Sequence, residues 1–416
     1  MWRLLRQVAC AALLVLLAAS VTGASTVDWY IRQLSDKDPG LRAEAARAMG
    51  VGACCRPVRA VPYLLHALSD PEWKVREAAA EALGYFSPAA DQCVPHLLER
   101  LSDQSVEVRR AVILSLGRLR ADSEEVRQAL KELAGDSDAG IRTNLMIAST
   151  LLGTTDDSAI PILVRALGSK SEPTSEAAGT ALKELANREP HRIVPALAEA
   201  LKSLDQRTVN NAAELLQHLP SPRDLTLPAI SGVYAEVDPR NRPLVLQILV
   251  QMDEEGKHAL PLCIKALADS EAAVRKEALA GAMRYESRLD DYVGPVIESL
   301  KDSEDENLLL ALEILRRLGH KATAAVPSLI ALTRSGSPAV RVGAVATLRK
   351  FTPPSKETLK ALEEALKDEN EEVRTASAAT LRAMRRRYPS GAIPVSQESA
   401  QSEKGNVPRH ESSGKH

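Results

Sequence analysis

The sequence predicts an all-α protein, a right-handed α–α superhelix of about eleven helix pairs. Three observations support this prediction. A pattern of two short amphipathic helices with a turn between them returns every 32 to 34 residues along the 416-residue chain. The composition is 45% hydrophobic but only 3% aromatic, which suits closely stacked helices rich in Leu and Ala. A single globular core of this length would be unusual, whereas a solenoid grows by adding units that contact only their neighbours.

The repeat is clearest between Ala60 and Tyr85. Leu64 and Leu68 lie one helical turn apart in its first helix, and apolar residues return at helical spacing after a break at Asp70. Pro62 stands near the start of the first helix, where the N–H that proline lacks has no intrahelical partner. Prolines in the same slot predict where other first helices begin, at Pro95, Pro161, Pro195, Pro228, Pro261, Pro295 and Pro327.

Two polar columns share this register. An arginine follows the proline slot by fourteen residues, at Arg42, Arg76, Arg109, Arg142, Arg242, Arg275, Arg341 and Arg374. An acid or a serine follows it by eight, at Asp36, Asp70, Asp103, Asp136, Ser169, Ser203, Asp269, Ser335 and Asp368. An aspartate there can cap the second helix and accept hydrogen bonds from a guanidinium. A row that binds ions or phosphate is one interpretation, but the fixed place in the repeat favours structural pairing along a ladder.

This Pro…Leu…Asp…Val-Arg…Ala…Leu pattern resembles the HEAT-repeat family of armadillo-type α-solenoids, in particular its short form in phycobilin-lyase-like proteins. The resemblance covers about Val27 to Met384. The period near 33 is shorter than the ~40 to 47 residues of ordinary HEAT repeats. The sequence has neither the T-P-L-H turn of ankyrin repeats nor the W-x-x-L-G-x-x-Y helix of tetratricopeptide repeats. The resemblance transfers no catalytic residue.

Three segments follow from this pattern. Residues 1–24 read as a secretory signal peptide, with two arginines, an apolar run from Val8 to about Ala19, and small residues after it. The run is short for a membrane span, so a secreted or periplasmic chain without a span after cleavage is predicted, and an uncleaved N-terminal anchor is the alternative. Residues 25–385 form the solenoid. Residues 386–416 have almost no apolar side chains and are predicted to be a disordered tail.

Some positions vary from repeat to repeat. Gly50, Gly84 and Gly117 stand where a helix commonly ends in the left-handed region. In repeats five to seven, Ser175 and Val209 replace the column arginine, which indicates either a binding segment or hinge, or degenerate units that a solenoid tolerates. The second interpretation, that the units are degenerate, is favoured.

In repeat nine the acids Asp302, Glu304, Asp305 and Glu306 lack the frame of a calcium loop and are predicted to be a solvated helix start.

Cysteines occupy two adjacent linkers near the N-terminus. Adjacent linkers of a solenoid lie side by side, and a cysteine in an oxidising compartment is expected to pair. The sequence therefore predicts a disulfide from Cys54 or Cys55 to Cys93. A metal site would need a fourth ligand and a C-x-x-C spacing, which is absent. Cys263 lies in the apolar column and is predicted to be a buried thiol.

No catalytic motif is found. The eight histidines are scattered, and H-E-x-x-H, G-x-S-x-G, the P-loop and a strand-to-helix G-x-G-x-x-G are all missing from the sequence. We therefore expect no catalytic residue, cofactor or metal, and the chain is predicted not to be an enzyme. A net charge of −2 argues against a nucleic-acid binder.

The sequence thus predicts a protein-interaction scaffold that uses the concave face lined by the second helices. That face is mixed in sign, which favours a protein or peptide partner, and a monomer is expected. An enzyme or enzyme accessory subunit with a lyase-like site assembled across several repeats is the alternative, and a purely structural spacer is a third possibility. The predicted partner-binding residues are Glu77, Glu81, Arg110, Asn210, Lys276 and Glu277.

Overall fold

The computed structural model describes residues 26–51, 58–154, 158–219, 221–285, 288 and 292–388. Within these ranges every regular element is helical and no strand occurs. The chain divides into two units, residues 1–241 (unit 1) and 242–416 (unit 2). The predicted signal peptide and nearly all of the predicted tail lie outside the described residues, so both stay predictions.

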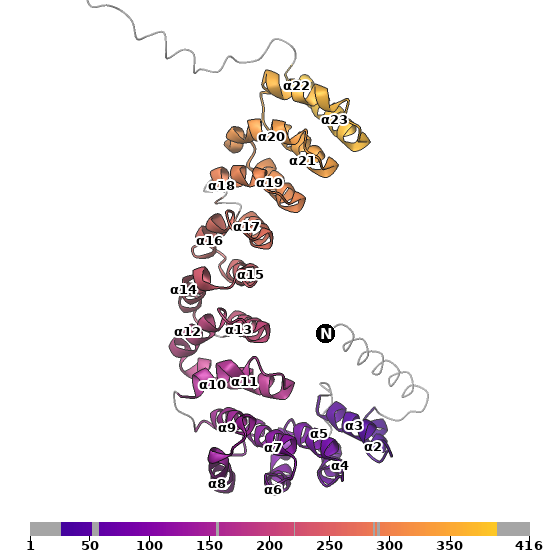
Figure 1. Ribbon diagram of the computed structural model, residues 1–416, viewed down its shortest axis with the longest axis vertical. Helices are drawn as coiled ribbons and strands as arrows, with labels where there is room; N and C mark the ends of the chain where they lie inside the picture. Colours follow the sequence, from indigo (N-terminus) through magenta and orange to yellow (C-terminus); the bar gives the residue numbers. More distant parts are fainter. Residues whose placement is uncertain are drawn as a thin grey trace, which may run out of the picture. The chain divides into compact units, whose positions relative to one another are not determined.

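Unit 1 consists of six helix pairs followed by one more helix (Figure 1). Figure 1 shows the second helices side by side along one face and the first helices along the other. The helices are α2 (Thr26–Gln33), α3 (Pro39–Val51), α4 (Val61–Ala67), α5 (Trp73–Leu83), α6 (Ala90–Arg100), α7 (Val106–Arg118), α8 (Glu124–Glu132), α9 (Ala139–Leu151), α10 (Ala159–Ala166), α11 (Glu172–Arg188), α12 (Pro190–Ala200), α13 (Gln206–His218) and α14 (Arg223–Val233).

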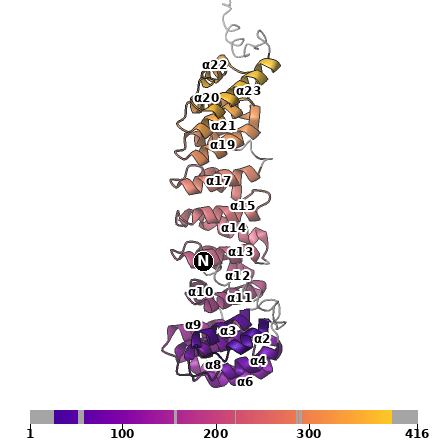
Figure 2. The ribbon, with the colours of Figure 1, turned by 90° about the vertical axis from the view of Figure 1, so that its right-hand side faces the viewer.

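Unit 2 begins with a second helix and continues with four helix pairs. In Figure 2 its second helices, α17, α19, α21 and α23, lie one above another. Its helices are α15 (Arg242–Met252), α16 (Ala259–Ala266), α17 (Ala272–Arg284), α18 (Val293–Glu298), α19 (Asp305–Leu318), α20 (Val326–Leu332), α21 (Pro338–Leu348), α22 (Lys356–Ala365) and α23 (Glu371–Arg387). In chain order the described helices make eleven pairs, and the predicted α-solenoid is confirmed.

The apolar column forms the core of each unit. Leu64 in α4 and Leu97 in α6 are fully buried, and so are Leu163, Leu197 and Leu329. The buried thiol predicted at Cys263 is also confirmed, since its side chain is fully buried in α16. Each repeat therefore buries its apolar side against the next one, which a single pair could not do alone.

The prolines mark the first turn of some helices but not of others. Pro62 and Pro327 stand in the first two positions of α4 and α20, as predicted. Pro95, Pro195 and Pro228 instead lie inside α6, α12 and α14, where an extra turn precedes them. A proline at such a place leaves the carbonyl four residues earlier without its helical donor, which a helix tolerates only near its start.

Gly50, Gly84 and Gly117 allow close contact between second helices, and their prediction as left-handed helix ends is wrong. Gly84 has an ordinary helical φ of −59°, while Gly50 and Gly117 lie inside α3 and α7. A Cβ on Gly84 would lie 2.9 Å from the Cα of Ser115, and one on Gly50 would lie 2.6 Å from the Cα of Ala82. A side chain at these positions would therefore push the backbones of adjacent repeats apart.

The predicted arginine–aspartate ladder is present at both ends of the chain. The arginine of each ladder pair contacts the aspartate of the following repeat. Carbonyls of the arginine's own turn accept from four of these residues, Arg42, Arg76, Arg275 and Arg341. Arg76, for example, donates to both carboxylate oxygens of Asp103 at 2.8 and 2.9 Å and to the carbonyl of Asp70 at 2.9 Å. The ladder pairs are Arg42–Asp70, Arg76–Asp103, Arg242–Asp269, Arg275–Asp302 and Arg341–Asp368.

The ladder aspartates do not cap the second helices directly, so that detail of the prediction is wrong. Asp70 accepts a hydrogen bond from the N–H of Glu72 at 2.9 Å, and Glu72 is the residue that stands at the N-cap of α5. The aspartate thus fixes the turn one step before the helix, in the manner of an Asx turn. Its second oxygen stays available to the arginine of the preceding repeat.

The ladder is interrupted between repeat three, which contains Arg109, and repeat seven, where Arg242 resumes it. Arg109 and Arg142 donate to the carbonyls of Asp103 and Asp136, at 2.8 and 2.7 Å, and neither forms an ion pair within the described part of the chain. Neutral contacts join these repeats instead. Asn211 donates to the carbonyl of Leu167 at 2.8 Å and to the hydroxyl of Ser175 at 3.0 Å. Ser175 thus replaces the column arginine with a buried hydrogen bond of its own.

Asp302 belongs to the ladder, and its prediction as part of a solvated acidic turn is wrong. Its side chain is 2% exposed and accepts from Arg275 at 2.6 and 2.9 Å. Burial alone would raise its pKa, but hydrogen bonds from Arg275, the Glu304 N–H and Asn307 lower the pKa to about 2. Asp302 is therefore held as a carboxylate at neutral pH.

Candidate functional site

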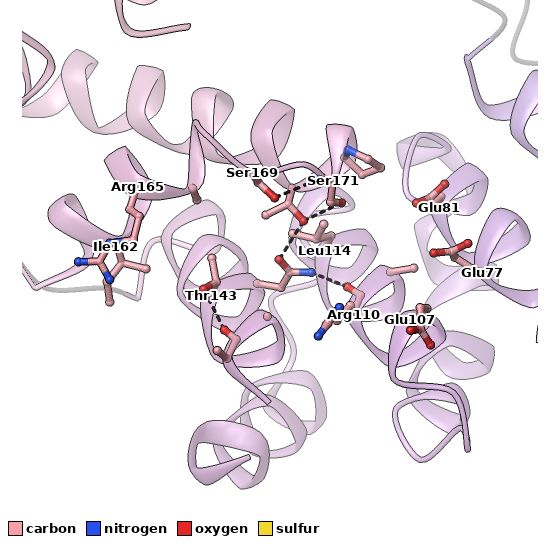
Figure 3. A pocket seen from close by; sticks show the side chains of 17 residues that line it. Glu77, Glu81, Glu107, Arg110, Leu114, Thr143, Ile162, Arg165, Ser169 and Ser171 are labelled. Atoms are coloured by element: carbon pink, nitrogen blue, oxygen red, sulfur yellow. Dashed lines mark hydrogen bonds between the residues drawn. The ribbon is translucent and has the colours of Figure 1, made fainter. Parts of the chain in front are cut away.

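A groove in unit 1, here called the unit 1 groove, lies between the second helices α5, α7 and α9 and the turn that leads from α10 into α11. It consists of two cavities of about 380 and 680 Å³ that share Glu77, Glu81, Ser171 and Pro173. Figure 3 shows Glu77, Glu81 and Glu107 on one side of the first cavity and Ile162 and Arg165 on the opposite side. Ser169 and Ser171 lie above the cavity in this view, and Arg110 and Thr143 lie below.

Glu77 and Glu81 are two largely desolvated carboxylates that line the unit 1 groove. They lie one turn apart on α5 with side chains 21% and 18% exposed. Arg47 of α3 contacts both, at 2.9 Å from Glu77 and 3.5 Å from Glu81, but is itself 47% exposed. Burial raises the pKa of both glutamates, and for Glu81 the neighbouring charge of Glu77 raises it further. The pair therefore carries more negative charge than Arg47 compensates.

Arg110 lies in the same cavity but is occupied by a partner of its own. Its guanidinium donates to both oxygens of Asp138 at 2.9 and 2.5 Å. Asp138 in turn caps α9 by accepting from the N–H of Ile141 at 2.8 Å. The hydrogen bonds from Arg110 are the main reason that the pKa of Asp138 falls to about 2. Arg110 therefore fixes the floor of the groove as well as carrying a charge into it.

Three residues that the sequence did not single out close the groove at its edge. The hydroxyl of Tyr85 donates to Glu176 at 2.7 Å, and Arg118 donates to the same carboxylate at 3.0 Å. Arg118 also donates to the carbonyl of Pro173 at 3.0 Å and stacks over the Tyr85 ring at 4.6 Å. Tyr85 and Glu176 line the second cavity. Burial is the main cause that raises the pKa of Tyr85 to about 12, so its hydroxyl keeps its proton.

The other predicted partner-binding residues lie elsewhere. Asn210 is exposed on α13, where it accepts from Gln206 at 2.9 Å. Lys276 and Glu277 belong to unit 2, on α17. Lys276 pairs with Glu306 at 2.5 Å, and burial raises the pKa of Glu277. Of the six predicted residues, the structure therefore brings Glu77, Glu81 and Arg110 together in one groove.

The predicted disulfide lies partly outside the described residues. Cys93 is fully buried in α6, and burial raises the pKa of its thiol to about 11. Cys54 and Cys55 belong to the linker that the structure does not describe. The pairing with Cys93 therefore stays a prediction.

No group of three or more His, Cys, Asp and Glu side chains is placed to hold a metal ion in the described ranges. None of the described helices combines the length and the apolar character that a membrane crossing requires.

Three solved structures illustrate the likeness of this chain to known proteins, all at low sequence identity. An engineered protein is 18% identical, with 87% of this chain and 99% of that one covered and a TM-score of 0.32. Importin beta is 13% identical, with 90% and 59% covered and a TM-score of 0.47. A chain from the structure of Kap95p binding to RanGDP is 12% identical, with 91% and 55% covered and a TM-score of 0.44. The chain thus spans less than two thirds of the last two.

The curated proteins contain no match to this chain. The sequence profile of HEAT repeats does match it, at residues 27–93, 61–150, 94–183, 293–382 and 326–411. These matches overlap from repeat to repeat and together cover more than half of the chain. The protein therefore belongs to the HEAT-repeat family.

Proposed function

We propose that the protein is an interaction scaffold that holds a peptide segment of a partner protein in the unit 1 groove. The observation that supports this most is the desolvated pair Glu77 and Glu81, which faces a cavity. The half-exposed Arg47 is the cation in direct contact with the pair, and the charges of Lys74 and Arg118 do not bring the pKa of either glutamate back to its ordinary value. A cation brought by a partner would gain more there than on the open surface, because water screens it less. The partner segment therefore carries a lysine or arginine at this point.

The mixed composition of the groove favours a peptide over a polyanion. Its walls combine carboxylates with apolar side chains such as Leu114 and Ile162 and with the hydroxyls of Thr143 and Ser171. A nucleic acid would require a positively charged surface. We place the complex outside the cytoplasm, in the secreted or periplasmic space, on the strength of the signal-like residues 1–24.

The double substitution Glu77→Gln and Glu81→Gln tests this function. It removes both charges but keeps the shape of the groove, so the partner should bind at least about tenfold more weakly. The folded protein should be no less stable, since two desolvated carboxylates that repel each other are replaced by neutral amides. The measurement is capture of envelope proteins by crosslinking, followed by titration of the captured partner.

Glu99→Gln on α6 is the matched control. Glu99 is exposed and belongs to a first helix, away from the cavity walls. This variant should capture the same partner with unchanged affinity. Equal binding by the wild type, the control and the double variant would count against the proposal.

An enzyme or accessory subunit with a site assembled across several repeats is the second candidate. Convergence of Glu77, Glu81 and Glu107 in one cavity, two of them with raised pKa values, is what supports it. The same walls contribute no histidine, cysteine or lysine. The double variant separates the two functions, because an enzyme would keep its partner and lose turnover, whereas a binding groove loses the partner itself.

A further inference from the structure

We propose that Tyr85, Arg118 and Glu176 form a clasp that holds α11 over the unit 1 groove and sets how wide the groove opens. The clasp is a feature of the free protein and does not depend on which partner binds. In a solenoid each repeat usually contacts only its neighbours. Here Tyr85 of repeat two and Arg118 of repeat three both reach Glu176 of repeat five.

The contacts of the clasp are charge-assisted, and its arginine is largely shielded from water. The side chain of Arg118 is 10% exposed, and one of its Nη atoms donates at 3.0 Å to both the Glu176 carboxylate and the Pro173 carbonyl. Tyr85 supplies the second donor to Glu176 and an aromatic face for the guanidinium. Hydrogen bonds of this kind are roughly twice as strong as neutral ones.

A second ion pair ties the same two helices farther along. Arg120, just beyond the end of α7, contacts Glu184 of α11. Arg120 is the one described residue other than glycine with a positive φ, at 53°, so the chain turns sharply where it presents this side chain. The end of α7 is therefore tied to α11 near the start of that helix, at Pro173 and Glu176, and again in its last third, at Glu184.

The position of the clasp explains why it would control access. Tyr85 and Glu176 themselves line the second cavity, together with Glu77 and Glu81 from α5 and Ser171 to Pro173 from α11. If α11 moves away from α5 and α7, this cavity opens on the side of α11. Glu176 is 55% exposed, so a competing cation from solvent or from a partner can reach it.

Distances between spin labels on α5 and α11 test the clasp in the free, full-length protein. Labels at Lys74 and Lys183, introduced through a ketone-bearing amino acid, leave the native cysteines untouched, and both sites are exposed. The wild type should give one narrow distance distribution. Glu176→Ala should raise the open population about tenfold, as expected for the loss of a charge-assisted hydrogen bond. Tyr85→Phe should have a smaller effect in the same direction.

Three comparisons make the result decisive. The double variant Glu176→Ala with Glu184→Ala removes the second tie and should open α11 further. Glu172→Ala, in the same turn of α11 and exposed, should leave the distribution unchanged. A label pair at Lys74 and Gln104, on neighbouring repeats, should not respond to any of these changes. A wild-type distance distribution in the double variant would overturn the clasp.

Discussion

Replacing Arg275 with methionine should lower the free energy of unfolding at pH 7 by about 3 kcal/mol, the lower end of the range for breaking a buried ion pair. The substitution keeps an apolar stem but leaves Asp302, 2% exposed, without its cationic partner. It also removes the donor to the carbonyls of Asp269 and Ser270. Urea unfolding followed by circular dichroism measures the loss, and hydrogen exchange in α17 and α19 locates it.

The pH dependence of this effect has a defined sign. The pKa of Asp302 in the folded protein, about 2, lies below its ordinary value of 3.8. Its contribution to stability is therefore complete above about pH 4 and is lost as the pH falls through 2. The difference between the wild type and Arg275→Met should shrink over the same window. A difference that stays constant from pH 7 to pH 2 would contradict the assignment of Asp302 to the ladder.

Two variants control the Arg275 experiment. The double variant Arg275→Met with Asp302→Asn should recover much of the loss, because no buried charge then remains unpaired. Arg127→Met removes an arginine from an exposed pair with Asp122 and should leave stability unchanged.

Replacing Gly117 with alanine should destabilise the protein by about 2 to 3 kcal/mol. The added Cβ would lie 2.7 Å from the Cα and 3.0 Å from the Cβ of Ala148, so the clash is with backbone and cannot be relieved by turning a side chain. Helices α7 and α9 would have to separate. Without that clash, alanine in a helix would be favoured over glycine by about 1 kcal/mol.

Gly232→Ala is the matched control for Gly117→Ala. Gly232 lies in α14, and outside its own stretch of helix no atom stands within 4 Å of the position where its Cβ would lie. This variant should therefore be slightly more stable than the wild type, and thermal unfolding compares the two. Equal shifts in melting temperature for both substitutions would show that the contact at Gly117 is not the cause.

The periodic features of this fold were predictable because the same residue types return at the same positions of most repeats. An arginine at one place in the repeat and an aspartate at another predicted the ladder, and the pairs Arg42–Asp70 and Arg76–Asp103 confirm it. In repeat nine the register of the apolar column and of the ladder aspartate is shifted by one residue relative to the proline. There Val296 is buried in place of Ile297, and Asp302 takes the ladder position although Pro295 placed it one residue later. A proline is tolerated at several positions of a first turn, so it fixes the register only to within a residue or more.

The unit 1 groove was predictable only in part. Glu77, Glu81 and Arg110 follow from their places on second helices, because neighbouring second helices share a face. The clasp could not be predicted in this way, since Glu176 lies in a repeat without the column arginine and its partners lie two and three repeats earlier. Contacts of that kind depend on how sharply the stack of helices curves, which no local spacing in the sequence specifies.

Photo-crosslinking at single positions tests most directly whether a partner occupies the unit 1 groove. A benzoyl-phenylalanine at Thr143 or Glu107 would report from the cavity, and one at His96 or Glu99 would report from the exposed side of α6. If the groove holds the partner, the Thr143 and Glu107 probes crosslink to one and the same segment of it, and the α6 probes do not. Crosslinks that form from α6 but not from Thr143 or Glu107 would contradict the account.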